Sequence, residues 1–385
     1  MTHRFAQEQG CCGPGPGGRS GGRSVGRRAW LLSLAQGLAV GTSATLLSGC
    51  AGWSWARFTD SLGLRAGDAA LDPALRTTLN RLYLRGAHAL LANDLDGTIA
   101  AWRELVAQAP AEWPRARQTR GHLTLLRRES GRRFARRAAA QEQARPSLAT
   151  DRLHVAVMPF ATLGAAATPG AAAFNRAVAA MVAVDLARVP ALTVLEREKV
   201  EALTNEIGLA SSPLVDPRTA LRPGQLLGAG SVVAGGVFNE AGPAGPGSGR
   251  YRIDAAVADV GSARSVGQVE AEGRQSEFFV LQKRVVHGIL DMLGVRDRPA
   301  SVDTIHTRSW EAYARFATGL SLLAEDRFDE ARLAFAAALK IDPAFALAQE
   351  SLLDTPERPA TLQQIQDTTR ATLPGLPAAS RSRGT

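Results

Sequence analysis

The chain has 385 residues and a formal net charge of +9, with 45 basic residues against 36 acidic ones. A chain of this length suits two or three modest domains. Nearly all of the positive charge is arginine, because lysine occurs only at Lys199, Lys283 and Lys340. All 3 cysteines lie within the first fifty residues, which excludes a disulfide framework in the rest of the chain.

The amino-terminal segment has the layout of a bacterial export signal. An apolar run from Ala29 to Leu47 ends in Leu47-Ser48-Gly49-Cys50, and it is preceded by four arginines: Arg19, Arg23, Arg27 and Arg28. The ending resembles a bacterial lipobox, whose cysteine thiol takes a diacylglycerol before cleavage. The alternative is a transmembrane anchor with a chance cysteine, but the run is marginal in length for a span and contains Gly and polar residues. We expect a signal peptide over residues 1–49 and lipidation of Cys50.

The other cysteines agree with this interpretation. Cys11 and Cys12 lie in the segment that would be removed, so Cys50 would be the one cysteine of the mature chain. A lone thiol is a liability in an oxidising periplasm unless it is capped. Ala51 follows Cys50 in place of an aspartate, and by resemblance to known sorting rules this favours the periplasmic side of the outer membrane. Arg27-Arg28 also resembles a twin-arginine signal, so both export routes stay open.

Residues 50–72 are expected to form a lipidated tether, and helical patterns follow over residues 73–150. Apolar residues from Leu79 to Leu91 recur at three- and four-residue steps, as an amphipathic helix requires. A second helix is expected from Ile99 to Pro110 and a third from about Trp113 to Arg128. The sequence from Glu129 to Thr150 has no sustained apolar stripe, which indicates a helical or loose linker.

The densest basic stretch lies between Arg115 and Arg137 and holds nine arginines. Nucleic-acid binding requires such a patch, but an exported protein meets little nucleic acid, so we expect none as a partner. Lipid phosphates, lipopolysaccharide and anionic cell-wall polymers are the alternative counterions. A solvated helix face without a partner is a further alternative.

Residues 151–297 alternate strand and helix patterns. Continuous or alternating apolar runs predict strands over Leu153–Pro159, Ala191–Leu195, Ser231–Val237, Tyr251–Val257 and Val266–Glu272. Helices are expected over Ala171–Ala187, Glu196–Ile207 and Glu277–Met292, and one begins at Asp216-Pro217. Pro223-Gly224 predicts that this last helix is kinked or split, because a mid-helix proline costs about 3 kcal/mol.

The segment over residues 304–350 repeats the first helical hairpin in register. Its residues at the spacing of the tetratricopeptide repeat are Gly319, Ala331, Phe335, Ala338 and Pro343, and their equivalents are Gly86, Thr98, Trp102, Leu105 and Pro110. Two generic helical hairpins are the alternative. Isolated repeats cannot bury their own apolar faces, so each is expected to dock on another surface. The Pro, Thr, Ser and Arg content of residues 351–385 predicts a disordered tail.

A family resemblance rests on four pieces of the central segment. Val155-Ala156-Val157-Met158-Pro159-Phe160 resembles the opening strand of the CsgG-like lipoprotein domain, the group that includes the curli secretion channel and penicillin-binding-protein activators. The further pieces are Val194–Val200, Val215-Asp216-Pro217 with the strand to Gly236, and Tyr251–Val260. The TolB amino-terminal domain has similar strands and is the nearest rival. The resemblance implies an α/β fold: a CsgG-like mixed sheet with packed helices, flanked by α-helical tetratricopeptide-like hairpins.

Motifs for catalysis, cofactors and metals were sought and not found in the sequence. The histidines have no metal-ligand spacing; they are His3, His88, His122, His154, His287 and His306. Gly228-x-Gly230 precedes a strand, so it would lack the helix N-terminus that binds phosphate. No Gly-x-Ser-x-Gly elbow occurs. We therefore expect no enzyme activity, no cofactor and no metal, and a periplasmic hydrolase is disfavoured.

The sequence predicts a lipid-anchored cell-envelope scaffold or assembly protein. Its helical repeats would bind envelope protein partners, its lipid would reach the membrane, and a homo-oligomer is compatible with this interpretation. The alternative is a subunit of a curli-type oligomeric secretion channel. Spanning strands need about 9–11 alternating residues each, and the segments Ala161–Gly170 and Asn239–Gly249 are too short and too rich in Gly and Pro. The resemblance therefore does not carry over the pore.

Overall fold

The computed structural model describes residues 71–140, 153–163, 170–208, 217–240 and 249–373. The expected signal peptide, Cys50 and nearly all of the expected tether lie outside the described residues. None of the helices within these ranges is both long and apolar enough to cross a membrane.

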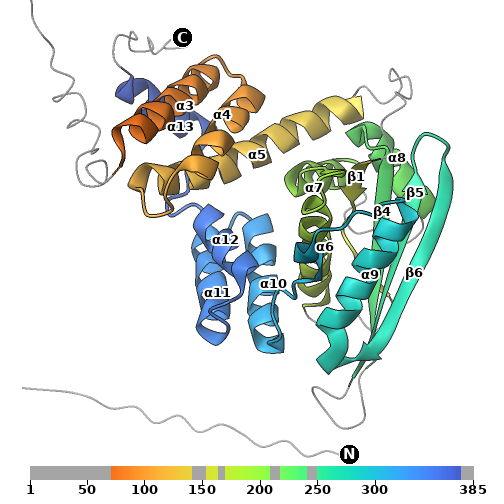
Figure 1. The fold of residues 1–385 in the computed structure, drawn as a ribbon. Helices are drawn as coiled ribbons and strands as arrows, with labels where there is room; N and C mark the ends of the chain where they lie inside the picture. Colours follow the sequence, from red (N-terminus) through yellow and green to blue (C-terminus); the bar gives the residue numbers. More distant parts are fainter. Residues whose placement is uncertain (1–70, 141–152, 164–169, 209–216, 241–248, 374–385) are drawn as a thin grey trace, which may run out of the picture. The chain divides into compact units, whose positions relative to one another are not determined.

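Figure 1 shows the elements in chain order. The amino-terminal helices are α3 (Pro73–Leu91), α4 (Leu95–Gln108) and α5 (Pro114–Ala140). The central part contains β1 (His154–Val157), β2 (Ala161–Leu163), α6 (Ala171–Ala187), β3 (Thr193–Val194), α7 (Arg197–Glu206), α8 (Pro217–Leu227), β4 (Ser231–Glu240), β5 (Arg250–Asp259), β6 (Arg264–Arg274) and α9 (Phe278–Met292). The carboxy-terminal helices are α10 (Trp310–Ala324), α11 (Phe328–Ile341), α12 (Ala346–Asp354) and α13 (Leu362–Thr372).

The central part is built on one mixed sheet of six strands. Its strand order is β3-β1-β4-β5-β6, with β2 also paired to β4. The strands β1, β2 and β3 run parallel to their neighbours, whereas β4, β5 and β6 form an antiparallel meander. The α/β fold class expected from the sequence is confirmed.

Helices cover both faces of this sheet. Val155 and Val157 of β1 belong to the core that α6 and α9 complete, whereas Ala156 and Met158 belong to the core that α7 and α8 complete. Successive side chains of a strand point to opposite faces, so the continuous apolar run in β1 is buried on both sides. The expected buried strand is confirmed.

The strand β2 was not expected from the sequence, because Ala161–Gly170 was interpreted as a connecting segment. It pairs with β4 at Gly236–Phe238, beyond the residues Ser231–Val233 that pair with β1. A strand of three residues is too short to show an alternating pattern, and it forms here because β4 extends past the end of β1.

A kink or a split was expected at Pro223-Gly224; the split is wrong, since α8 is continuous from Pro217 to Leu227. Close packing on the sheet explains why the helix continues. A methyl group placed at Gly224 would lie 2.4 Å from Cγ2 of Val232 in β4, so only glycine permits this approach. Ala220 and Leu226 of the same helix are buried, and this burial offsets the backbone hydrogen bond that proline cannot make.

The helices α3 and α4 form one hairpin, and α10 and α11 form another. The last residues of α3 and α10 lie as far apart in the sequence as the first residues of α4 and α11 do. The last residues of α4 and α11 are separated by the same number of positions. The turn residues Asn93 and Asp326, related by that offset, have φ angles of 60° and 61°. The two hairpins therefore share one construction in register, while their assignment to the tetratricopeptide family stays a prediction.

Each hairpin closes on a glycine that faces an aromatic ring. A methyl group at Gly86 would lie 2.2 Å from the Trp102 ring, and one at Gly319 would lie 2.4 Å from the Phe335 ring. Trp102 also donates a hydrogen bond from Nε1 to the Tyr83 carbonyl at 3.2 Å. The close approach of the paired helices therefore depends on the absence of a side chain at both glycines.

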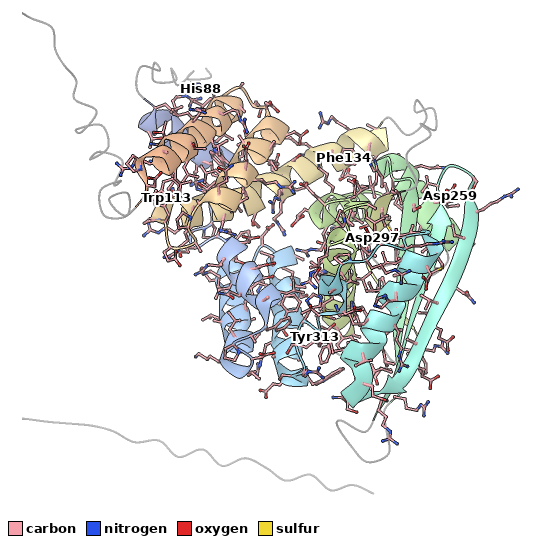
Figure 2. The ribbon with its side chains drawn as sticks, in the orientation of Figure 1. His88, Trp113, Phe134, Asp259, Asp297 and Tyr313 are labelled. Atoms are coloured by element: carbon pink, nitrogen blue, oxygen red, sulfur yellow. The ribbon has the colours of Figure 1, made fainter. Side chains whose placement is uncertain are left out.

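The carboxy-terminal hairpin docks on the α/β domain through aromatic side chains. The Tyr313 hydroxyl of α10 donates a hydrogen bond to the Phe174 carbonyl of α6 at 2.8 Å, and the two rings meet edge to face with centroids 4.9 Å apart. Trp310 lies 5.0 Å from Tyr251 of β5 and 5.4 Å from Phe278 of α9. Figure 2 marks Tyr313 at this contact. The docking surface that an isolated hairpin needs is thus provided by α6, β5 and α9.

The amino-terminal hairpin packs on α5 and α13 instead. Its apolar cluster joins Leu90 and Trp102 to Leu126 of α5 and Ile365 of α13. The disordered tail expected over residues 351–385 is therefore wrong for its first half, because α13 is a helix with buried Ile365. Polar Gln and Thr residues dominate α13, and the few apolar positions gain their partners only from helices far away in the sequence.

We predict that Gly319→Val destabilises the chain by about 2–3 kcal/mol, because the added side chain must displace the buried Phe335 ring. The matched control is Ala314→Val on the exposed side of the same helix, where only the helix propensity changes, by less than about 1 kcal/mol. Urea unfolding followed by circular dichroism measures both. Equal losses for the two variants would contradict the close packing described here.

Candidate functional site at the α5 junction

The helix α5 connects the three parts of the described chain. It packs against α4 of the amino-terminal hairpin, α7 of the α/β domain, and α12 and α13 of the carboxy-terminal part. Figure 1 shows it extending from the first hairpin toward α7 and α8. It begins where the third helix was expected and continues to Ala140, so the first part of the stretch that was expected to be a helical or loose linker is helical. The reason is tertiary: Ala135 and Ala138 are buried against Leu203 of α7.

The arginines of α5 are largely engaged in contacts within the chain. Two of them contact the first hairpin. Arg115 lies over the Tyr83 ring at 4.4 Å, and Arg133 donates to Asn93 Oδ1 at 2.9 Å. Arg120 pairs with Asp354, the last residue of α12, at 3.4 Å. Arg128 pairs with Asp326 at 2.7 Å and donates to the Ala324 carbonyl at 3.1 Å. The basic stretch, expected to face an anionic partner or solvent, therefore supplies many of its charges to internal bridges.

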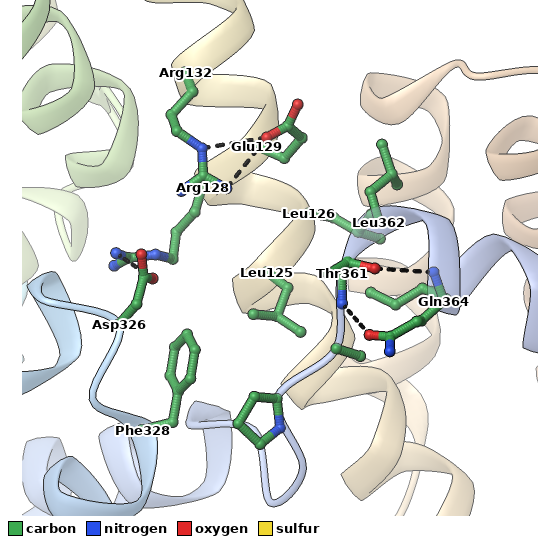
Figure 3. Close-up of a pocket in the computed structure, with 13 residues that line it drawn as sticks. Leu125, Leu126, Arg128, Glu129, Arg132, Asp326, Phe328, Thr361, Leu362 and Gln364 are labelled. Carbon is green, nitrogen blue, oxygen red and sulfur yellow. Dashed lines mark hydrogen bonds and ion pairs between the residues drawn. The ribbon is translucent and has the colours of Figure 1, made fainter.

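One hollow lies between α5, the turn before α11 and the segment that leads into α13. It has a volume of about 410 Å³, and Figure 3 shows its lining. Apolar side chains provide most of the wall, including Leu125, Phe328 and Leu362. The Arg128–Asp326 ion pair lies at one edge. We call this space the apolar hollow.

A second hollow, of about 370 Å³, lies among α5, α6, α7 and the end of α10. It shares Arg128, Arg132 and Asp326 with the apolar hollow, and its other charged lining residues are Arg176, Glu198, Glu201 and Glu325. Burial by itself would raise the pKa of the Glu198 carboxyl, but the charges of Arg197, Arg127 and Arg128 hold that pKa below its ordinary value. The second hollow therefore carries ionised groups of both signs, and we call it the charged hollow.

A buried polar cluster locks the α/β domain to the segment before α10. Asp185, at the end of α6, accepts hydrogen bonds from Lys283 Nζ at 2.6 Å and Gln282 Nε2 at 2.9 Å, both from α9. His306 Nε2 lies 2.9 Å from the second carboxylate oxygen, and Arg188 donates to that oxygen at 3.1 Å. The Asp185 side chain is fully buried, at 0 % exposure.

The cluster keeps Asp185 charged. Burial alone would raise the pKa of this carboxyl, but the hydrogen bond and charge of His306, with the bonds from Gln282 and Lys283, hold the pKa below its usual value. Burial lowers the pKa of Lys283, and Asp185 opposes that change. Neither Asp185 nor Lys283 lines the two hollows. A buried ion pair of this kind joins the structural elements that carry its members.

The structure separates the histidines that the sequence analysis considered. His88 is exposed on α3, whereas His122 on α5 and His154 on β1 are half-buried; Figure 2 marks His88. His287 meets Asp303 at 2.6 Å and Arg298 at 3.1 Å in a surface cluster. His3 lies outside the described residues. Across the described ranges, no group of three or more His, Cys, Asp or Glu residues could hold a metal ion.

The fold and the α5 junction define an α/β domain with helical hairpins attached, and the family comparison agrees with this class. A family model described as "Curli production assembly/transport component CsgG" matches residues 136–270. The match begins in the last turn of α5 and covers β1 to β5 and most of β6. The chain therefore contains a CsgG-like domain. No curated protein matches the chain.

Several residues of the junction were not identified from the sequence. Asp326 pairs with Arg128, which lies far away in the sequence, so no local pattern indicates this pair. Asp185 offered a signal that could have been used, because it is an acidic residue on the apolar face of α6 among Met181, Val182 and Leu186. Its partner Lys283 is one of only three lysines in the chain. Cys50, the one site residue predicted from the sequence, lies outside the described residues.

We predict that Asp185→Asn destabilises the chain by about 3–5 kcal/mol, because it leaves the buried Lys283 ammonium without its counter-charge. The control is Asp291→Asn, which removes a carboxylate that pairs with Arg298 at the surface and changes stability by less than about 1 kcal/mol. Chemical denaturation at pH 7 measures both variants. If Asp185→Asn were as stable as the control, the cluster would not lock the domain.

The buried histidine on α5 predicts a pH dependence of stability. Burial lowers the pKa of His122 from 6.5 to about 4. The folded state therefore binds this proton less readily than the unfolded state, so full stability is present above pH 6.5 and is lost progressively as the pH falls to about 4. The expected loss from this group is about 2–3 kcal/mol.

Unfolding measured between pH 7 and pH 4 tests this expectation. His122→Gln should reduce the slope of stability against pH over that range, because it removes the titrating group. His88→Gln, a change at the exposed histidine of α3, should leave the slope as it is in the unaltered chain. A slope that is the same in all three proteins would show that His122 stays accessible to protons.

Proposed function

We propose that this chain is a non-enzymatic cell-envelope protein that acts in assembly or transport by binding envelope protein partners. The observation that carries the proposal is the CsgG-like domain itself, matched over residues 136–270 and described as a curli assembly and transport component. The helices attached to this domain add surfaces of a kind that binds other helices. We further propose that lipid on Cys50 holds the protein at the periplasmic face of the outer membrane, with no nucleic acid among its partners.

The α5 junction supports a binding role. The apolar hollow offers desolvated contact area, and the charged hollow beside it offers both signs of charge. Protein interfaces combine these features as an apolar centre with a polar rim. The Arg128–Asp326 pair stands between the two hollows, so a partner segment that spans both would contact this pair.

A second candidate is a subunit of a curli-type secretion channel, and the description of the matching family favours it. The lengths of two connections weigh against it. The connections between β2 and α6 and between β4 and β5 each contain too few residues for two spanning strands of about 9–11 residues. We therefore place the scaffold function first.

The test of the proposed function begins with the anchor. In cells fed radioactive palmitate, the unaltered chain should carry label and fractionate with outer membranes, because three acyl chains hold a protein far more firmly than one. Cys50→Ser should lose the label and accumulate as the unprocessed precursor. Cys11→Ser is the matched control, since this cysteine lies in the segment to be removed, and it should be labelled like the unaltered chain.

A measurement on the purified protein and one in the cell distinguish the scaffold from the channel. A scaffold conducts no ions when it is added to a planar bilayer, and site-specific cross-linking from the rim of the charged hollow, for example at Arg132, should capture envelope proteins in the cell. Discrete single-channel currents would overturn the scaffold function and favour the channel. A mature amino terminus at any residue other than a modified Cys50 would overturn the anchor.

A further inference from the structure

The carboxy-terminal helix α13 covers an apolar site on the amino-terminal hairpin. Ile365 and Thr369 lie four residues apart on one face of the helix and are buried, and Leu373, directly after the helix, is buried as well. This face lies across α3 and α5, where Ile365 joins the cluster that contains Leu90 and Leu126. Gln366 donates a hydrogen bond from Nε2 to the Leu90 carbonyl near the end of α3, at 3.1 Å.

The attachment of α13 is modest for a structural helix. It has 11 residues, of which three are threonine, and an isolated helix shorter than about 12–15 residues is marginal in water. Its ion pair is internal, between Arg370 and Asp367. The capping box at its start, between Thr361 and Gln364, is internal as well. The helix is therefore held on α3 and α5 by the apolar contacts of Ile365 and Leu362 and by the hydrogen bond of Gln366.

The fit of α13 to its site is also incomplete. The apolar hollow continues beside Ile365 and Leu362, bounded by Leu125 and Phe328, so apolar wall is left uncovered where α13 begins. Residues 355–361, which contain Pro356 and Pro359, lead across α5 to this point. A longer or bulkier helix would fill space that α13 leaves empty.

The other hairpin shows what a permanent helix contact looks like in this chain. There α10 packs on α6 through Tyr313 and Trp310, with a buried hydrogen bond and a cluster of aromatic rings. Both hairpins thus present their first helix to a helix from elsewhere in the chain. The amino-terminal one holds a short, polar helix, which contacts α3 and α5.

We propose that the surface of α3 and α5 beneath α13 is a binding site for an amphipathic helix of a protein partner, and that α13 is its built-in competitor. The partner helix carries apolar residues three positions apart, as α13 does at Leu362 and Ile365, with a larger apolar residue at the end that meets the apolar hollow. It also offers a side-chain donor to the Leu90 carbonyl. This inference concerns the helical hairpin alone and does not depend on the lipid anchor or the CsgG-like domain.

The probe is a fluorescent peptide of residues 359–373, and the protein is the full chain purified in detergent. Bound α13 reduces the fraction of open sites, so the unaltered chain should bind the peptide weakly. Ile365→Asp in the chain displaces α13 and should tighten peptide binding by about tenfold or more. Ile365→Ala, a milder change, should tighten it by a smaller factor. Fluorescence anisotropy measures all three.

Matched controls separate the site from general effects. Thr368→Gln changes an exposed residue of α13 and should bind the peptide as the unaltered chain does. A peptide that itself carries Ile365→Asp should bind none of the chains. Circular dichroism and thermal melting report whether the helices of the hairpin persist in each variant.

Each remaining outcome overturns the proposal. Equal peptide affinity for the unaltered chain and for both Ile365 variants would show that α13 does not occupy the peptide's site. Loss of the α3–α5 helices in both variants would show that α13 is a fixed part of the core. Dimers that exchange α13 between two copies would make the occupant a second copy of the chain in place of a partner's helix.

Discussion

A two-helix hairpin cannot enclose its own apolar side chains, and this constraint organises the described part of the chain. Both hairpins have an aromatic ring closed over a glycine, and both retain an apolar face that needs another surface. The carboxy-terminal hairpin places that face on the α/β domain through Tyr313 and Trp310. The amino-terminal hairpin obtains its surface from α5 and α13. The relation of the helices to the CsgG-like domain follows from these two solutions.

Charge completes what apolar packing begins. The arginines of α5 bind acidic groups and carbonyls on elements that are remote in sequence, and a planar guanidinium suits such contacts because it donates in several directions. At the other side of the domain, Asp185 collects Lys283, Gln282 and His306 around one buried carboxylate. Both arrangements use charge to hold elements together, and the two hollows lie beside the first of them. The candidate binding site is therefore a consequence of the way the hairpins are attached.

Local patterns in the sequence predicted most elements, and the misses share a cause. The range of α6 agrees with its amphipathic pattern, and the ends of α4 and α11 follow the repeated register. The strand β2, the continuity of α8 at Pro223 and the helix α13 were not predicted, because each is stabilised by contacts with a distant segment. The pattern within a few residues carries no information about such a partner.

The sequence by itself determined the features that depend on neighbours along the chain. These are the lipobox-like ending at Cys50, the α/β succession that resembles the CsgG-like domain, and the paired hairpins. Only the tertiary structure decided that Arg128 meets Asp326, that Lys283 meets Asp185, and that the end of the chain returns to α3 as α13. Ion pairs and helix contacts of this kind form between residues that the fold brings together. Their partners are therefore set by the packing of whole elements, which no local pattern encodes.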